Sequence, residues 1–375
     1  MILLTTEENL GEKDEFMTCQ AVNTCEYIFR NSNDIIVRFG ETVEVRDGKT
    51  AKVYEGGRAI VYDGGKAEVF DGGMASVYDH GKADIFEGGQ ADVFTGGNVT
   101  AYDGGEATAY EGGRADVKEG GYSRVLEGGQ ADAFEGGVVV VYDGGTADVR
   151  KGGRAVVYEG GGAGVYDGGQ ADVFKDGEAI VHSGGVAVTR NGGTADVRRG
   201  GKVVVRRGGE ANIRDGGTAV VYWGGTADVQ GGGKAVVYDG GKATVYGNNK
   251  IDAIHEPKKS GVADVRDGGE AIVLDGGHAD VRAGGQASVH ENGEAFVYDG
   301  GEADVLDGGR ADVFEGGTAD VRDGAEAVVF RNGVAVVHEG GYVDVRDGGI
   351  KVKYEEFMKS EQTDRDVDET VGRRR

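Results

Sequence analysis

Proline is nearly absent from the sequence: Pro257 is the only one among 375 residues. Glycine is abundant, with 74 residues, but collagen needs glycine at every third position together with frequent proline, so a collagen-like fold is excluded. No stretch approaches the ~20 consecutive apolar residues of a membrane helix, so we expect no membrane association. Disordered low-complexity chains lack regular β-branched residues, whereas valine recurs here at fixed spacing. The glycines therefore belong to a folded repeat.

Cysteine is also scarce, since only Cys19 and Cys25 are present and both precede the repeats. Their C-x5-C spacing, with no histidine cluster nearby, is not a zinc pattern, and both a disulfide and two reduced thiols stay open. The first residues carry neither a basic segment nor a sustained apolar run, so we expect no signal peptide and synthesis in a cytoplasm. Assembly into a virion is an alternative destination.

Positive charge is in deficit: 41 Lys and Arg residues are outnumbered by 66 Asp and Glu residues, which gives a net charge of −25. Proteins that bind nucleic acid through phosphates need a basic surface, so direct nucleic-acid binding is not expected. An acidic surface favours solubility, and it also allows a protein to bind cations or to mimic a polyanion.

The sequence is dominated by an eight-residue repeat, Gly-Gly-x-Ala-x-Val-x-x, whose positions we number from one to eight. The second glycine recurs every eight residues from Gly57 to Asn249, which occupies a glycine slot, and the repeat resumes at Gly261. The same phase extends back to residue 32 and forward to residue 355, which gives about 40 units. Position four is alanine in 31 units and position six is valine or isoleucine in 34. Positions three, five and seven are mostly polar, charged or aromatic.

Alternation of this kind, closed by Gly-Gly, predicts a half-buried strand followed by a tight turn, because glycine supplies the positive φ that such corners need. Glycine pairs every eight residues exclude helix. We therefore predict an all-β fold, an elongated parallel β-solenoid in which each strand pairs with the equivalent strand of the next coil. Two eight-residue strands per 16-residue coil are favoured, because alanine and valine fill a narrow interior. The alternative, three strands per 24-residue coil, would leave voids.

The repeat also sets the domain boundaries. Residues 1–31 are expected to form an N-terminal cap, residues 32–355 the β-solenoid, and residues 356–375 a C-terminal tail or cap. Residues 247–260 break the register and are predicted to form a loop insertion at one corner. Lys351 and Lys353 occupy the two core slots of the last unit, and inward-pointing charge of this kind blocks the addition of further strands.

Position seven is aromatic in 20 of the units, and in a solenoid these rings become outward ladders. Two interpretations stay open: the rings stack on each other and stabilise the sheets, or they form an adhesive face for glycan or protein. The candidate binding face is the unbroken run of Tyr54, Tyr62, Phe70, Tyr78, Phe86, Phe94, Tyr102 and Tyr110.

A basic segment interrupts the acidic pattern. It provides either charge compensation or a docking patch for an acidic partner. The candidate patch is Arg198, Arg199, Lys202, Arg206, Arg207 and Arg214.

The repeat, with aspartate or glutamate at position eight in 26 units, loosely resembles the calcium-binding β-roll repeats of the RTX family, G-G-x-G-x-D-x-U-x. The glycine pair and the strand alternation match. However, the unit has eight residues, alanine replaces the third glycine, and valine fills the aspartate slot. The resemblance therefore implies a solenoid fold but carries over no calcium ligand. No cofactor is expected, and weak Ca²⁺ binding at the Asp-Gly-Gly turns is left open.

No H-E-x-x-H, G-x-S-x-G or phosphate-loop motif occurs, and the six histidines are scattered, so we expect no enzymatic activity. In architecture such uniform solenoids resemble phage tail-fibre shafts, bacterial surface stalks and bactofilin-type cytoskeletal solenoids. The resemblance implies a structural or scaffold role, with protein partners or self-association. The alternative is a binding module: either an aromatic-faced adhesin for glycan or protein, or an acidic nucleic-acid mimic.

Overall fold

The computed structural model describes residues 15–20, 24–29, 34–238, 241–246, 261–274 and 276–357. These residues form strands and tight turns, together with one helical turn at 354–357. The chain divides into two compact units, Met1–Ala179 (unit 1) and Ile180–Arg375 (unit 2), which we describe separately. Within the described ranges, no helix has the length and apolar character that a membrane span requires.

Unit 1 contains two parallel sheets, which we name after the parity of their strands. Its even sheet is formed by β4 (Thr42–Val45), β6 (Arg58–Val61), β8 (Met74–Val77), β10 (Gln90–Val93), β12 (Glu106–Ala109), β14 (Tyr122–Val125), β16 (Val138–Val141), β18 (Arg154–Val157) and β20 (Gln170–Phe174). Its odd sheet is formed by β3 (Asp34–Val37), β5 (Thr50–Val53), β7 (Lys66–Val69), β9 (Lys82–Ile85), β11 (Asn98–Ala101), β13 (Arg114–Val117), β15 (Gln130–Ala133), β17 (Thr146–Val149) and β19 (Gly162–Val165). Strand β21 (Glu178–Val181) spans the unit boundary.

Unit 2 repeats this arrangement. Its even sheet is formed by β22 (Val186–Arg190), β24 (Lys202–Val205), β26 (Thr218–Val221), β28 (Lys234–Val237), β30 (Val262–Val265), β32 (His278–Val281), β34 (Glu294–Val297), β36 (Arg310–Val313), β38 (Glu326–Val329) and β40 (Tyr342–Val345). Its odd sheet is formed by β23 (Thr194–Val197), β25 (Glu210–Ile213), β27 (Thr226–Val229), β29 (Lys242–Tyr246), β31 (Glu270–Leu274), β33 (Gln286–Val289), β35 (Glu302–Val305), β37 (Thr318–Val321), β39 (Val334–Val337) and β41 (Ile350–Lys353).

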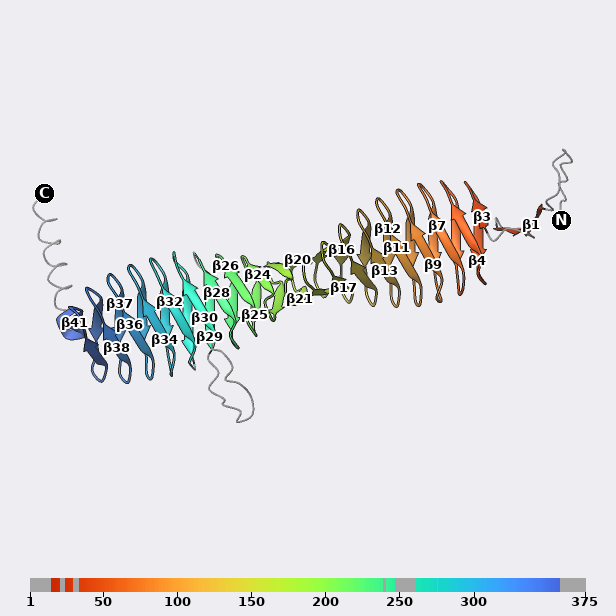
Figure 1. Cartoon of the computed structure of the whole chain (residues 1–375). Helices are drawn as coiled ribbons and strands as arrows, with labels where there is room; N and C mark the ends of the chain where they lie inside the picture. The colour runs from red at the N-terminus through yellow and green to blue at the C-terminus, as the bar shows by residue number, and fades with distance from the viewer. Residues whose placement is uncertain are drawn as a thin grey trace, which may run out of the picture. The chain divides into compact units, whose positions relative to one another are not determined.

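In both units the strands of the even and odd sheets pair in parallel with the strand two places along the chain, so that Ala91 lies opposite Ala107 and Ala303 opposite Ala319. The coil therefore has 16 residues and two strands, which confirms the parallel β-solenoid with two sheets (Figure 1). The alternative of three strands and 24 residues per coil is wrong. Residues eight apart in the sequence lie on different sheets, and residues sixteen apart lie side by side on one sheet.

The core is built from positions four and six. Ala59 and Val61 in unit 1 and Ala311 and Val313 in unit 2 have no exposed surface. Val99 at position four and Ala101 at position six are also fully buried, so the exchange of sizes within one strand keeps the core filled. Positions three, five and seven point outward, which is the alternation that the sequence predicts for a strand with one buried face.

The two corner glycines serve different purposes. Gly112, the first of its pair, has a φ of +69°, in the region that glycine adopts without steric cost. Gly113, the second, does not need a positive φ, but a Cβ atom there would lie 2.3 Å from the carbonyl oxygen of Val93. The sequence argument, which assigned both glycines to backbone conformation, is therefore correct for the first glycine and incomplete for the second.

Thr189 replaces valine at position six of β22 and is fully buried. Its Oγ1 has no hydrogen-bond partner among the described residues, and Val205 lies opposite it in the next strand of the sheet. A buried hydroxyl without a partner costs about 1–3 kcal/mol.

We expect Thr189→Val to raise the free energy of unfolding by an amount in this range, measured by urea denaturation. The matched control Val205→Thr should lower it, and a stabilised control would contradict this interpretation of the core.

The register continues across the interruption of the repeat. Strand β28 pairs with β30, where Lys234 lies opposite Val262, and β29 pairs with β31. The extra residues therefore enter the chain at a single corner between β29 and β30. The predicted loop 247–260 itself lies outside the described residues.

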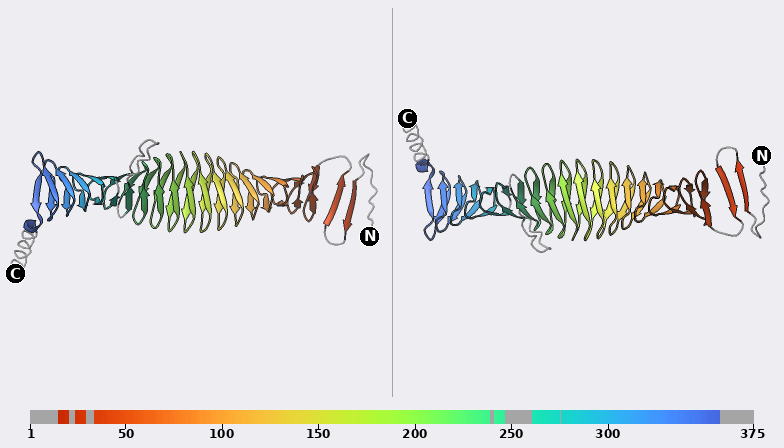
Figure 2. Two further views of the ribbon diagram at one scale, coloured as in Figure 1. Left: turned by 90° about the horizontal axis from the view of Figure 1, so that it is seen from below. Right: turned by 90° about the horizontal axis from the view of Figure 1, so that it is seen from above.

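The predicted caps fall partly outside the described residues. From the N-terminal cap 1–31, the structure describes β1 (Glu15–Gln20) and β2 (Thr24–Phe29), which form an antiparallel hairpin that places Cys19 opposite Cys25 (Figure 2). At the other end, Lys351 and Lys353 of β41 are exposed, as expected for core slots that no further coil covers. Of the predicted C-terminal tail or cap, residues 358–375 are outside the described range.

Candidate functional site

A groove lies on the outer face of the odd sheet in unit 2. It has a volume of about 690 Å³ and crosses strands β31, β33, β35, β37 and β39. Its lining residues are Glu270, Ala271, Ile272, Gln286, Ala287, Ser288, Glu302, Ala303, Asp304, Thr318, Ala319, Asp320, Arg322, Val334, Val336, Tyr354 and Phe357.

The octad explains why a groove forms here. Two rows of outward side chains run along it, one from position three and one from position five, and the alanine of position four lies between them with its side chain in the core. The floor is therefore backbone, and the rows form the two walls. Between β33 and β37 the walls are polar, with Ser288 and Thr318 among their members, and at β39 they become apolar, with Val334 and Val336.

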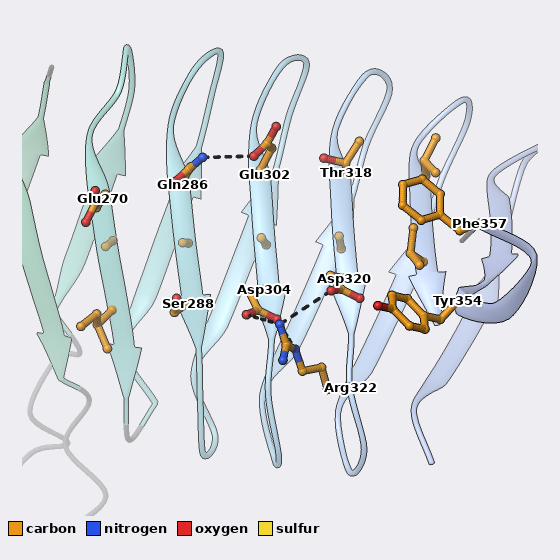
Figure 3. Close-up of a pocket in the computed structure, with 17 residues that line it drawn as sticks. Glu270, Gln286, Ser288, Glu302, Asp304, Thr318, Asp320, Arg322, Tyr354 and Phe357 are labelled. Carbon is orange, nitrogen blue, oxygen red and sulfur yellow. Dashed lines mark hydrogen bonds and ion pairs between the residues drawn. The ribbon is translucent and has the colours of Figure 1, made fainter. Parts of the chain in front are cut away.

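The carboxylates on the groove walls are held by fixed partners. Arg322 donates to Asp304 from Nε at 2.8 Å and from Nη2 at 3.0 Å. His338 Nε2 lies 2.5 Å from Asp320 Oδ1. Figure 3 shows Arg322 joined to both Asp304 and Asp320, the two aspartates of the wall formed by position five. These pairs orient the carboxylates and leave the wall acidic.

The opposite wall carries glutamates. Gln286 Nε2 donates to Glu302 Oε2 at 3.2 Å, along the sheet from one coil to the next (Figure 3). Glu270, farther along, pairs with Lys242 at 2.6 Å. Glu302 thus accepts from a neutral amide, and it is exposed to solvent.

The helical turn 354–357 closes one end of the groove. Tyr354 and Phe357 lie at this end of the groove (Figure 3), and they are 39% and 37% exposed. Val334 and Val336 also belong to the lining. The ring of His338 stacks on Tyr354, with the centroids 4.0 Å apart. The sequence argument did not place Tyr354 or Phe357 at a groove, because it ended the solenoid at residue 355 and assigned residues 356–375 to a C-terminal tail or cap. The signal available in the sequence was the aromatic pair just beyond the last strand, β41.

The eight aromatic residues proposed as a binding face form two ladders on different sheets. Tyr54, Phe70, Phe86 and Tyr102 follow the odd strands of unit 1, and Tyr62, Tyr78, Phe94 and Tyr110 follow the even strands. Neighbouring rings are stacked with centroids between 4.6 Å and 5.5 Å apart. Since interior rings use both faces for stacking, they present their edges to solvent. Arg46 lies 4.1 Å above the ring of Tyr62, at one end of its ladder.

This stacking leads to a stability prediction. Phe86 stacks on two rings, Phe70 and Tyr102, whereas Tyr54 stacks on Phe70 at the end of the ladder. At 0.2–1 kcal/mol for each cross-strand pair, Phe86→Ala should lose roughly 0.4–2 kcal/mol, about twice the loss in Tyr54→Ala. Chemical denaturation of both variants checks this, and equal losses would argue that the rings do not stabilise each other.

The six residues of the predicted basic patch do not form one surface. Arg198 and Arg214 lie on the odd sheet of unit 2, and both pair with Asp196, at 2.5 Å and 3.2 Å. Lys202 and Arg206 belong to the even sheet. Of the corner residues, Arg199 has a φ of +36°, and Arg207 lies 5.2 Å from the ring of Trp223. The pairing with Asp196 agrees with the charge-compensation interpretation.

Position eight, at the corner after each strand, is often Asp or Glu, so that successive coils present a row of carboxylates. In unit 1 the corners after the odd strands carry Glu55, Asp71, Glu87, Asp103, Glu119 and Glu135. Asp71 Oδ1 lies so close to Gly88 of the next coil that it would meet a Cβ there at 2.1 Å. No group of three His, Cys, Asp or Glu residues that could hold a metal ion occurs in the part of the chain that the structure describes. Weak calcium binding stays a prediction.

A smaller hollow of about 260 Å³ lies on the even sheet of unit 1, beside the ladder that ends at Tyr110. Arg58 Nη2 donates to the buried Ser76 Oγ at 3.2 Å. Burial raises the pKa of Tyr110, and Asp92 raises it further through its charge and a hydrogen bond.

No family model and no curated protein matches the chain. Among solved structures, the chain is similar to one described as the TibC-catalyzed hyper-glycosylated TibA55-350 fragment. The sequence identity is 25%, the alignment covers 85% of this chain and 98% of that chain, and the TM-score is 0.23.

Proposed function

We propose that the chain is a non-enzymatic structural scaffold that holds partner-binding surfaces on a uniform series of coils, as a component of a phage or bacterial surface fibre or of a cytoplasmic assembly. One observation carries the proposal. The inward positions repeat alanine and valine with little change through both units, whereas the outward positions change from coil to coil. A protein built in this way varies its surface without disturbing its core.

The chemistry of the groove fits a binding surface better than a catalytic one. Asp304 and Asp320, its two central carboxylates, are engaged by Arg322 and His338. General acid or base catalysis needs a group that is free to exchange a proton with a substrate. Carboxylates held by fixed partners instead provide a fixed pattern of charge.

Removal of one complete coil tests the scaffold proposal. Deletion of residues 58–73 takes out β6 and β7, joins Gly57 to Met74 in the correct phase, and keeps every later strand on its own sheet. Because each coil contacts only its neighbours, the deleted chain should fold. In affinity capture from lysate of the source cell, it should retain the same proteins as the intact chain. Loss of those proteins while the β signal in circular dichroism persists would contradict a modular scaffold.

A second candidate, the acidic nucleic-acid mimic, is favoured by the row of six carboxylates from Glu55 to Glu135 at the odd corners of unit 1. Such a mimic would capture basic DNA-binding proteins, and salt would release them as the charges are screened. Replacement of these six residues by glutamine or asparagine separates the two proposals. It should abolish capture by a mimic and leave capture through the groove unchanged.

A further inference from the structure

We infer that the groove on the odd sheet of unit 2 binds an extended, basic polypeptide segment that carries an apolar residue at one end. This inference deepens the scaffold proposal, on which it rests, by assigning a class of partner to one surface. It is argued from the shape, charge and apolar end of the groove.

The dimensions of the groove suit a single extended chain. It crosses five neighbouring strands of one sheet, from β31 to β39. With strands ~4.8 Å apart this corresponds to roughly 19 Å, the length of about six residues of extended peptide. The two walls are separated by one residue of the strand, the buried alanine of position four, so a folded element would not enter.

The charge of the groove selects the chemistry of the ligand. Four lining residues are carboxylates, and Arg322 is the one lysine or arginine in the lining. Glu270 pairs with Lys242 and Asp304 with Arg322, whereas Glu302 accepts a hydrogen bond from the neutral amide of Gln286. Glu302 is exposed on the wall opposite Asp304, so a cation on the groove floor would meet carboxylates from both sides. Arginine pairs with carboxylates in a bidentate geometry, and lysine pairs with them as a point charge. An anionic ligand would be repelled.

The apolar end supplies affinity that exposed ion pairs lack, since such pairs contribute only about 0–1 kcal/mol each. Val334, Val336, Tyr354 and Phe357 form a patch at the closed end, and the two aromatic rings are more than one third exposed. An aliphatic side chain seated there would bury these rings and fix the direction of the bound segment. Its basic residues would then extend toward Glu302.

Peptide binding is the direct test. The probe is a fluorescein-labelled peptide of sequence LGRGRR, and the matched probe LGEGEE reverses its charge. Fluorescence anisotropy with the full-length chain should show saturable binding of the basic peptide, weakened by salt, and no binding of the acidic peptide. A chain that binds both peptides equally, or neither, would overturn the inference.

Three variants assign the binding to the groove. Glu302→Lys should weaken binding by roughly tenfold, because it places a cation beside the basic segment. Phe357→Ala should also weaken peptide binding, and the size of this loss should not depend on the salt concentration. Glu210→Lys is the matched control, because Glu210 is exposed at position three of the same sheet but lies outside the groove. An equal loss in the control would show that binding follows net charge alone, which would refute the assignment.

The chain's own residues 358–375, which contain "VGRRR", are the competing occupant. If the peptide bound only after deletion of residues 358–375, the groove would serve this segment and the partner assignment would be overturned.

The peptide experiment also separates the groove proposal from the scaffold proposal. Suppose that the full-length chain binds no basic peptide, but that the chain lacking residues 58–73 still captures the same proteins as the intact chain. That result would refute the proposed ligand of the groove and would leave the scaffold proposal standing.

Discussion

Replacement of Val93 by aspartate is expected to unfold the coils around β10. Val93 is fully buried at position six, and its neighbours in the sheet are Val77 and Ala109. None of these side chains offers a partner to a carboxylate, so the variant must either bury an unpaired charge or open the coil. A loss of several kcal/mol in the free energy of unfolding is expected. Urea denaturation followed by circular dichroism measures it.

The control for this variant lies in the same strand. Gln90→Asp introduces the same carboxylate at position three, where the side chain is exposed. A surface substitution of this kind normally changes stability by no more than about 0.5 kcal/mol. Similar losses in Val93→Asp and Gln90→Asp would show that the inward and outward positions have been assigned wrongly.

Addition of a single methyl group at a second corner glycine is expected to have the next largest effect. In Gly113→Ala the new Cβ would lie 2.3 Å from the carbonyl oxygen of Val93 and 2.7 Å from its carbonyl carbon. The clash is with backbone, which cannot rotate away as a side chain can. Overpacking of this kind costs about 1–3 kcal/mol, and we expect a loss near the upper end, measured by denaturation and by hydrogen exchange of the flanking coils.

Gly162→Ala is the matched control. A Cβ at Gly162 would meet only Thr146 Cγ2, at 3.9 Å, so the change should be neutral or should stabilise the chain by about 0.4–1 kcal/mol. Ala325 occupies a second-glycine slot in unit 2. Its N–H donates to the Arg322 carbonyl oxygen at 3.1 Å, which is within the range of the glycine corners, such as 3.2 Å at Gly341. A loss in Gly162→Ala as large as in Gly113→Ala would contradict the steric explanation.

Most of the fold could be predicted from the sequence, because the octad encodes it locally. Alternation identifies buried residues such as Ala59 and Val61, and their small volume favours two sheets per coil over three. The function of Gly113 could not be found in this way, because the atom that excludes a side chain belongs to Val93, twenty residues earlier in the chain. That contact exists only after the coils stack.

The candidate sites were harder to predict, because surface neighbours depend on the parity of the strand. Lys202 and Arg206 follow Arg198 closely in the sequence, but they belong to the other sheet, whereas Arg214, sixteen residues from Arg198, shares its partner Asp196. The groove combines residues from alternate strands with a helical turn beyond the last one. Once the 16-residue coil is known, the rows of outward side chains can be read from the sequence. The position of Phe357 at the end of the groove cannot be read in this way.

The distance between two corner residues of unit 1 tests the 16-residue coil most directly. Glu55 and Lys151 are exposed at equivalent corners, 96 residues apart. Spin labels at Glu55→Cys and Lys151→Cys, in a chain that also carries Cys19→Ser and Cys25→Ser, report their separation by pulsed electron paramagnetic resonance. Six coils at ~4.8 Å predict a narrow distribution near 29 Å, whereas four coils of 24 residues would give roughly 19 Å. A narrow distribution at the longer distance is the expected result, and a peak at the shorter one or a broad distribution would contradict the account.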